Sequence, residues 1–177
     1  SSEIVLFQIL RILCKLSHLE GVQDKIRGPD CIKWMMISLE KYLKHKGIVL
    51  RTFYILGNIT MSIHNSHELI FKNIEIISTV YAYQAFHVQP MPMDIIIGIL
   101  RLLGNLSLVK HIGDQISRIR SIQECLLRLT DFAETEELSL YLCATQSNYT
   151  YFKNKDNILL QNSRKLMQCM LFFDIYN

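Results

Sequence analysis

The sequence predicts an all-α fold, a right-handed α-solenoid of about four stacked helical repeats. Four similar apolar segments place Lys15, Asn58, Asn105 and Asn148 at equivalent positions, and these markers are separated by 43, 47 and 43 residues. A period in the forties is typical of arrays whose units pack on their neighbours. Half of the 177 residues are apolar, and only seven are glycine and three proline, which indicates a folded, helix-rich chain.

Each marked segment predicts an apolar helix that ends in a polar step. In the third segment, Ile95, Ile99 and Leu106 recur at the spacing that places them on one face of a helix. Gly98 and Gly104 weaken their helix relative to alanine, so we expect neighbouring helices to approach closely there, and Gly57 stands in the second unit at the place that corresponds to Gly104. The related stretches are RILCKLS (11–17), YILGNIT (54–60), RLLGNLS (101–107) and CATQSNYT (143–150).

Further helices are predicted between the marked segments. Pro29 suits a helix start, and Pro90 and Pro92 separate the second unit from the third. A break is also expected at Gly113–Asp114. The longer predicted helices span 31–43, 74–86, 119–132 and 164–174, and the short third helices span 68–72, 114–118 and 156–161.

The units are predicted to form one continuous domain over residues 1–177. No linker divides the chain, and both ends carry apolar segments, at 4–7 and 170–176. A terminal repeat needs a polar outer face for solubility. These ends therefore indicate a part of a longer array, or ends that pack on other chains. The repeats are placed at about 1–46, 47–89, 90–134 and 135–177.

Composition and motifs argue against several classes of function. A formal net charge of +3 is too small to indicate nucleic-acid binding, and no apolar stretch is long enough to predict a membrane span. Five cysteines without close pairing predict neither a disulfide framework nor a zinc site. His64, His67 and Glu68 lack a third ligand at fixed spacing, so we expect a solvated loop there. No phosphate loop or nucleophile motif occurs. We expect a protein without enzymatic activity or cofactor.

The polar step resembles that of the armadillo repeat family. In that family an asparagine on the third helix of each repeat lines a groove and bonds an extended peptide. The resemblance assigns this position to Asn58, Asn105 and Asn148, with Lys15 in the first unit. Importin-type members also carry a tryptophan before the asparagine, whereas Trp34, the only tryptophan here, lies between marked segments.

A closer resemblance covers about residues 47–170. The stretches LRT (50–52), LGNIT (56–60), EEL (136–138) and NYTY (148–151) are similar to the armadillo repeat-containing protein 2 family of motile cilia and flagella. This resemblance implies an adaptor in the assembly of axonemal radial spokes, including those of sperm flagella. It implies a cytoplasmic and axonemal location, with radial spoke or ciliary transport components as partners.

The leading hypothesis from the sequence is a scaffold that holds an extended or helical segment of another protein. The ladder asparagines can line the groove, or they can be internal brackets that bond a neighbouring helix end. The basic cluster Lys41, Lys44, His45, Lys46 and Arg51 would seat an acidic segment if it is functional. The alternatives are a purely structural segment of a large assembly without a groove, and a cytoplasmic or nuclear peptide-binding adaptor. The further candidate interface residues are Arg51, Arg101, Tyr149 and Tyr151.

Overall fold

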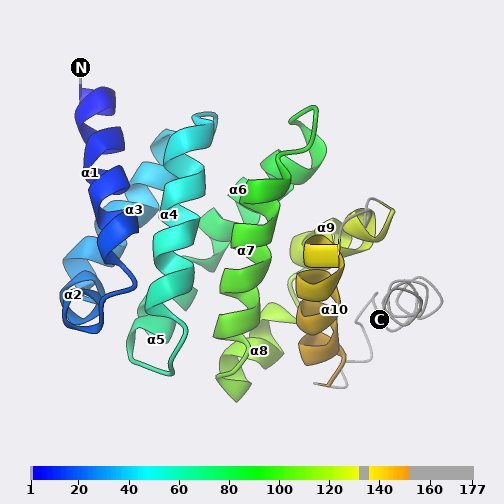
Figure 1. Ribbon diagram of the computed structural model, residues 1–177. Coiled ribbons are helices and arrows are strands. Elements are labelled where there is room, and N and C mark those ends of the chain that lie inside the picture. Colours follow the sequence, from blue (N-terminus) through cyan, green and yellow to red (C-terminus); the bar gives the residue numbers. More distant parts are fainter. Residues whose placement is uncertain (1, 132–135, 152–177) are drawn as a thin grey trace.

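The protein is an armadillo-like helical solenoid, which confirms the predicted fold class. The computed structural model describes residues 2–131 and 136–151, and within these ranges it contains ten helices and no strand (Figure 1). The helices are α1 Ser2–Leu16, α2 Glu20–Ile26, α3 Pro29–Lys41, α4 Lys46–Ile59, α5 Ser66–Phe71, α6 Ile74–Phe86, α7 Met93–Leu106, α8 Lys110–Ile116, α9 Arg120–Thr130 and α10 Glu136–Tyr151.

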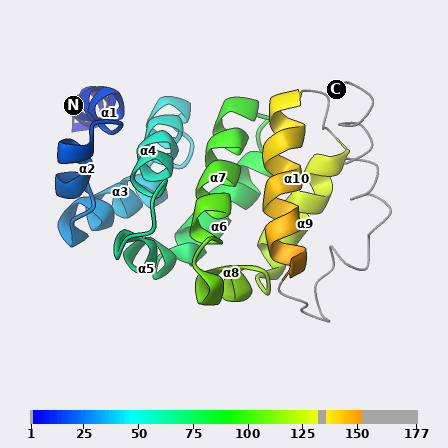
Figure 2. The same ribbon diagram turned by 60° about the horizontal axis from the view of Figure 1, so that its bottom comes forward.

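The longer helices form two layers. The marked helices α1, α4, α7 and α10 lie side by side in one layer, and each contacts the next (Figures 1 and 2). Helices α3, α6 and α9 form the second layer. The short helices α2, α5 and α8 connect the two layers along one edge of the array, the bottom edge of Figure 1, which comes forward in Figure 2. One surface of the first layer is therefore continuous across all four marked helices.

A continuous apolar core fills the space between the layers. Phe53 of α4 and Tyr81 of α6 are fully buried in it. Helices α4 and α7 approach closely, because a Cβ atom added at Gly98 would lie 3.3 Å from Cβ of Phe53. The close approach that the sequence predicts at Gly98 is therefore present. Burial on this scale drives the stacking of units that would not be stable alone.

Most predicted helices are present, with some differences at their ends. Helix α6 has the predicted bounds, and α3 begins at Pro29 in the first helical turn. The predicted break at Gly113–Asp114 is wrong, because both residues lie inside α8. The sequence reasoning also missed α2, the short helix of the first unit. The helices predicted over 156–161 and 164–174 lie outside the described residues, and the division into four repeats stays a prediction.

The predicted solvated loop around His67 is wrong for that residue. His67 and Ser66 are buried at the start of α5, although His64 is exposed. His67 Nδ1 lies 3.0 Å from the carbonyl oxygen of His64. Burial disfavours the charged imidazolium and lowers the pKa of His67. Within the described residues, no three histidine, cysteine or acidic side chains are grouped so as to hold a metal ion.

The buried imidazole predicts a pH-dependent stability. In the unfolded chain the histidine takes up a proton near its ordinary pKa of about 6.5. In the folded chain its pKa is lower, so the unfolded state binds more protons as the pH falls. The stabilising contribution is complete above about pH 6.5 and decreases below it. Urea unfolding at pH 7 and pH 5 should show a smaller pH effect for His67→Gln than for the unmodified chain. His64→Gln is the matched control, and equal pH effects in all three proteins would contradict the assignment.

Candidate partner-binding surface

One side of the first layer carries most of the predicted site residues, and we call it the ladder face. Each marked helix contributes three residues to it. These are the residue at the marker position and the residues four and seven positions before it. Because the marked helices are neighbours, these positions fall into rows across the array. The ladder face comprises Gln8, Arg11 and Lys15 of α1, Arg51, Tyr54 and Asn58 of α4, Gly98, Arg101 and Asn105 of α7, and Tyr141, Ala144 and Asn148 of α10.

The three ladder asparagines bond the preceding unit. The side-chain N–H of Asn58 donates to Ser17 Oγ at 2.7 Å. That of Asn105 donates to the Gly57 carbonyl oxygen at 3.0 Å and to Thr60 Oγ1 at 3.2 Å. Asn148 repeats the arrangement with Ser107 Oγ at 2.8 Å. Each amide therefore fixes the last turn of one marked helix against the end of the previous one.

These hydrogen bonds form the internal bracket, which was one of the two interpretations of the ladder asparagines that the sequence left open. Asn58 is only 3% exposed, whereas Asn105 and Asn148 are partly exposed. Lys15 at the equivalent position of α1 is exposed. Contact between these ladder residues and a partner protein stays a prediction. The partly exposed amides leave more surface for it than Asn58 does.

Two arginines of the ladder face are held by aromatic rings of the preceding helix. The guanidinium of Arg51 lies 4.4 Å from the ring centre of Phe7, and its Nη1 donates to the Gly47 carbonyl oxygen at 3.0 Å. The guanidinium of Arg101 lies 5.8 Å from the ring centre of Tyr54. Cation–π contacts of this kind stabilise an arginine in one orientation. Both charged groups are therefore held in one orientation on the ladder face.

Glycine makes room for the second of these arginines. A Cβ atom added at Gly57 would lie 3.4 Å from Cδ of Arg101. The aliphatic part of Arg101 therefore lies directly against the α4 backbone at Gly57. A larger side chain at this position would push the arginine away from Tyr54. This contact at Gly57 lies on the ladder face, and a Cβ atom added at the predicted position Gly104 would lie 3.6 Å from Thr145 Oγ1 of the next marked helix.

The ladder face carries positive charge on α1, α4 and α7. Within the described residues, none of Arg11, Lys15, Arg51 and Arg101 forms an ion pair with a carboxylate. Two other residues of the predicted basic cluster lie near a carboxylate, whereas Lys41 and Lys44 form no ion pair among the residues that the structure describes. His45 lies 3.4 Å from Glu3, and Lys46 lies 3.3 Å from Asp94. Of that cluster, Arg51 is the member that joins the ladder face.

Arg11 and Tyr54 are among the residues of this surface that sequence reasoning missed. Tyr54 is 45% exposed, and Arg11 is exposed with Nη1 donating to Gln8 Oε1 at 3.1 Å. The available signal was their spacing. Each stands four residues before a marker position, as Arg101 does before Asn105.

Two further predicted interface residues lie on α10. Tyr149 and Tyr151 belong to the last turn of α10, and their side chains lie outside the described residues. Trp34 does not belong to the ladder face and lies on α3, in the second layer. In the described part of the chain, no helix has the length and apolar character that a membrane crossing requires.

Three curated relatives support an armadillo-repeat family for the chain. The chain is similar to proteins named armadillo repeat-containing protein 2, with 22% identity to that of Mus musculus, 24% to that of Homo sapiens and 23% to that of Bos taurus. The first two alignments cover 92% of this chain and the third covers 80%. The chain spans about a fifth of the length of these relatives, or 21%, 22% and 19%. No family model matches the chain, and no solved structure matches it.

Proposed function

We propose that this armadillo-like array is a protein-binding scaffold without enzymatic activity, and that its ladder face holds an acidic, extended segment of another protein. The observation that carries the proposal is the set of four cationic side chains on adjacent helices without a carboxylate partner in the described residues. These are Arg11, Lys15, Arg51 and Arg101. The armadillo-repeat relatives support the same class of function, since such arrays present a long surface to a partner.

The arrangement of the two stacked arginines suits recognition of carboxylates. A guanidinium can bind both oxygens of a carboxylate through parallel N–H donors. Because Arg51 and Arg101 already rest on Phe7 and Tyr54, binding should cost less side-chain entropy than it would for mobile arginines. The exposed ring of Tyr54 offers an additional apolar contact between the two charges. The partner segment would then cross α4 and α7 at the level of these side chains.

The finer part of the proposal concerns the cellular setting. The resemblance to the armadillo repeat-containing protein 2 family leads us to place the scaffold in the cytoplasm and the axoneme, in the assembly of radial spokes. Affinity purification from ciliated or spermatogenic cells, scored for radial spoke and ciliary transport components, tests this setting. A set of partners confined to the nucleus would exclude it and would leave the acidic-segment proposal to its own test.

Reversing the two stacked charges is expected to weaken capture of an acidic peptide by at least about tenfold. The probe is a fluorescent twelve-residue peptide of alternating glutamate and serine, followed by fluorescence anisotropy at low and moderate salt. The test variant is Arg51→Glu combined with Arg101→Glu. The matched control is Arg118→Glu with Arg120→Glu, which reverses two exposed arginines, one in the turn after α8 and one at the start of α9. An equal loss in both double variants would mean that net charge rather than the ladder face binds the probe.

A further inference from the structure

Two exposed apolar side chains continue the ladder face beyond its marker row, and we call this pair the apolar rim. Met61 of the second unit is 63% exposed, and Leu108 of the third unit is 55% exposed. Each stands three residues after its marker asparagine, so the two positions are equivalent in the repeat. Two neighbouring units in the middle of the array therefore present a large apolar side chain to solvent at the same place.

The backbone places the apolar rim in line with the ladder face. The N–H of Met61 donates to the Asn58 carbonyl oxygen at 3.4 Å, and the N–H of Leu108 donates to the Asn105 carbonyl oxygen at 3.2 Å. These bonds keep the chain close to a helical course just after each marker. Arg101, Asn105 and Leu108 therefore follow the i, i+4, i+7 spacing of one helix face. The second unit repeats this spacing up to Met61.

Asn105 connects the two residues of the apolar rim. Its side-chain N–H donates to Thr60 Oγ1 at 3.2 Å, and Thr60 immediately precedes Met61. Its carbonyl oxygen accepts the bond from Leu108. Both rim residues therefore lie next to Asn105, on the two sides of the boundary between the second and third units. Asn105 is itself partly exposed, so the polar and apolar parts of this surface are continuous.

The first unit anchors the chain on both sides of Met61. Arg27 is buried, and its Nε donates to the Ile59 carbonyl oxygen at 3.0 Å. Its Nη2 donates to Ser62 Oγ at 3.1 Å. The backbone at Met61 is therefore held in place while the side chain stays in solvent. A fixed apolar side chain loses little freedom when a partner covers it, which favours binding.

The position of the rim relative to the arginines sets the spacing of a ligand. Seven residues along a helical course place Leu108 about 10 Å beyond Arg101. An extended chain covers this distance in about three residues. A segment that pairs an acidic residue with Arg101 and continues along α7 can therefore place an apolar residue between Leu108 and Met61.

We propose that the ladder face recognises a two-part segment of another protein, in which large apolar residues lie about three positions from acidic residues and pack on the apolar rim. The inference rests on the proposed function, because the acidic part needs Arg51 and Arg101. The charged part speeds and orients the encounter, and the apolar part adds buried area that a purely acidic segment lacks. The rim thus distinguishes such a partner from acidic chains in general.

Three peptides test the inference by fluorescence anisotropy. The first is the twelve-residue acidic probe. The other two also carry a pair of leucines three positions from the glutamate nearest the C-terminal or the N-terminal end, because an extended segment can run in either direction. We expect one leucine peptide to bind at least about fivefold more tightly than the acidic probe. This gain should persist at higher salt, which screens charge pairs but not apolar contacts.

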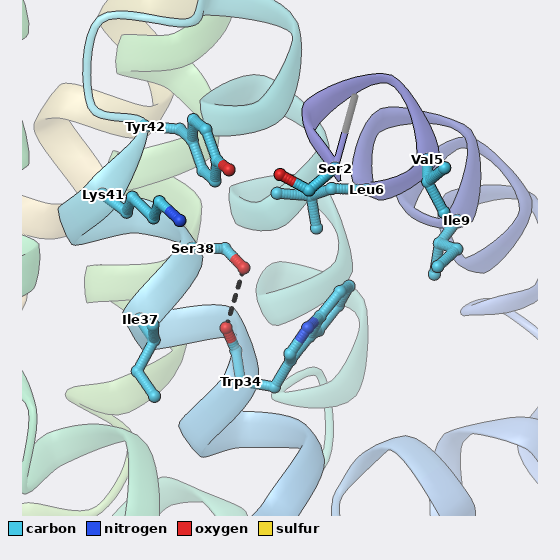
Figure 3. Close-up of a pocket in the computed structure, with 9 residues that line it drawn as sticks. All are labelled: Ser2, Val5, Leu6, Ile9, Trp34, Ile37, Ser38, Lys41 and Tyr42. Carbon is cyan, nitrogen blue, oxygen red and sulfur yellow. Dashed lines mark hydrogen bonds between the residues drawn. The ribbon is translucent and has the colours of Figure 1, made fainter.

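Variants of the chain locate the gain. Met61→Ser combined with Leu108→Ser should remove it and leave binding of the acidic probe unchanged. Ile37→Ser is the control, because Ile37 is 50% exposed but lies on α3 in the second layer (Figure 3). Arg51→Glu with Arg101→Glu should weaken all three peptides. Circular dichroism should show the same helix content in the two serine variants, since the replaced side chains are exposed.

The results separate this inference from the proposed function. If neither leucine peptide binds more tightly than the acidic probe, or if the gain survives the double serine variant, the apolar rim does not bind the partner and the acidic-segment proposal stands alone. Absence of binding by all three peptides would remove the proposed function and this inference with it. If the chain sediments with phosphatidylcholine vesicles and the double serine variant does not, a lipid surface covers the rim instead.

Discussion

Replacing Phe53 with alanine is expected to lower the free energy of unfolding by about 3–5 kcal/mol. Phe53 is fully buried in α4, where α7 packs against it at Gly98. Alanine would leave a cavity between two marked helices whose backbones cannot easily move closer. Urea unfolding followed by circular dichroism at 222 nm measures the change. A second probe, Trp34 fluorescence, shows whether the first unit unfolds together with the rest.

Tyr54→Ala is the matched variant for this prediction, because Tyr54 is the next residue of α4 and points about 100° around the helix from Phe53, toward solvent. Its ring is partly exposed, so we expect a loss of stability below about 1 kcal/mol. Capture of the acidic peptide should weaken, since Arg101 loses the ring that positions it. If Phe53→Ala costs no more stability than Tyr54→Ala, the contact between α4 and α7 does not hold the array together.

The contrast between these neighbours shows why the sequence predicted the fold well. Core residues of a long helix recur every three or four positions, so the rows around Phe53 and Ile99 are visible in the sequence. The same reasoning missed α2, because a helix of seven residues with Val22 and Ile26 as its apolar side chains is too short to display a period. It also placed His67 in a solvated loop, since local polarity does not report burial by a neighbouring unit.

The candidate site was predicted in its positions but not in its contacts. A groove and an inter-repeat bracket both require a polar side chain in the last turn of the marked helix, so Asn105 fits either interpretation from sequence alone. Only the distances to Gly57 and Thr60 reveal the bracket. The unpaired charge of Arg101 depends on which carboxylates lie nearby in space. A linear sequence does not contain that information.

The surfaces also explain how stability and binding are connected in this array. The brackets formed by Asn58 and Asn105 fix the spacing between neighbouring marked helices. That spacing sets the distance between Arg51 and Arg101, and hence which partner segments fit. A change in a bracket can therefore alter binding without any direct contact with the partner. Measurements of capture need a stability measurement on the same variant.

Asn58→Ala is expected to lower the free energy of unfolding by about 1–3 kcal/mol. The change removes the amide that donates to Ser17 Oγ at 2.7 Å in a buried position between α1 and α4. Asn65→Ala is the control, because Asn65 is exposed and its side chain does not cap α5. Urea unfolding of both variants gives the comparison.

A double-mutant cycle with Ser17→Ala isolates the bracket itself. If the hydrogen bond is the source of the loss, the double variant should lose clearly less stability than the sum of the two single variants. Capture of the acidic peptide, measured well below the unfolding transition, then separates the two interpretations of the ladder. Capture unchanged by Asn58→Ala would assign this residue to the bracket alone. A loss of capture together with additive stability losses would instead mean that Asn58 contacts the partner, despite its burial in the free protein.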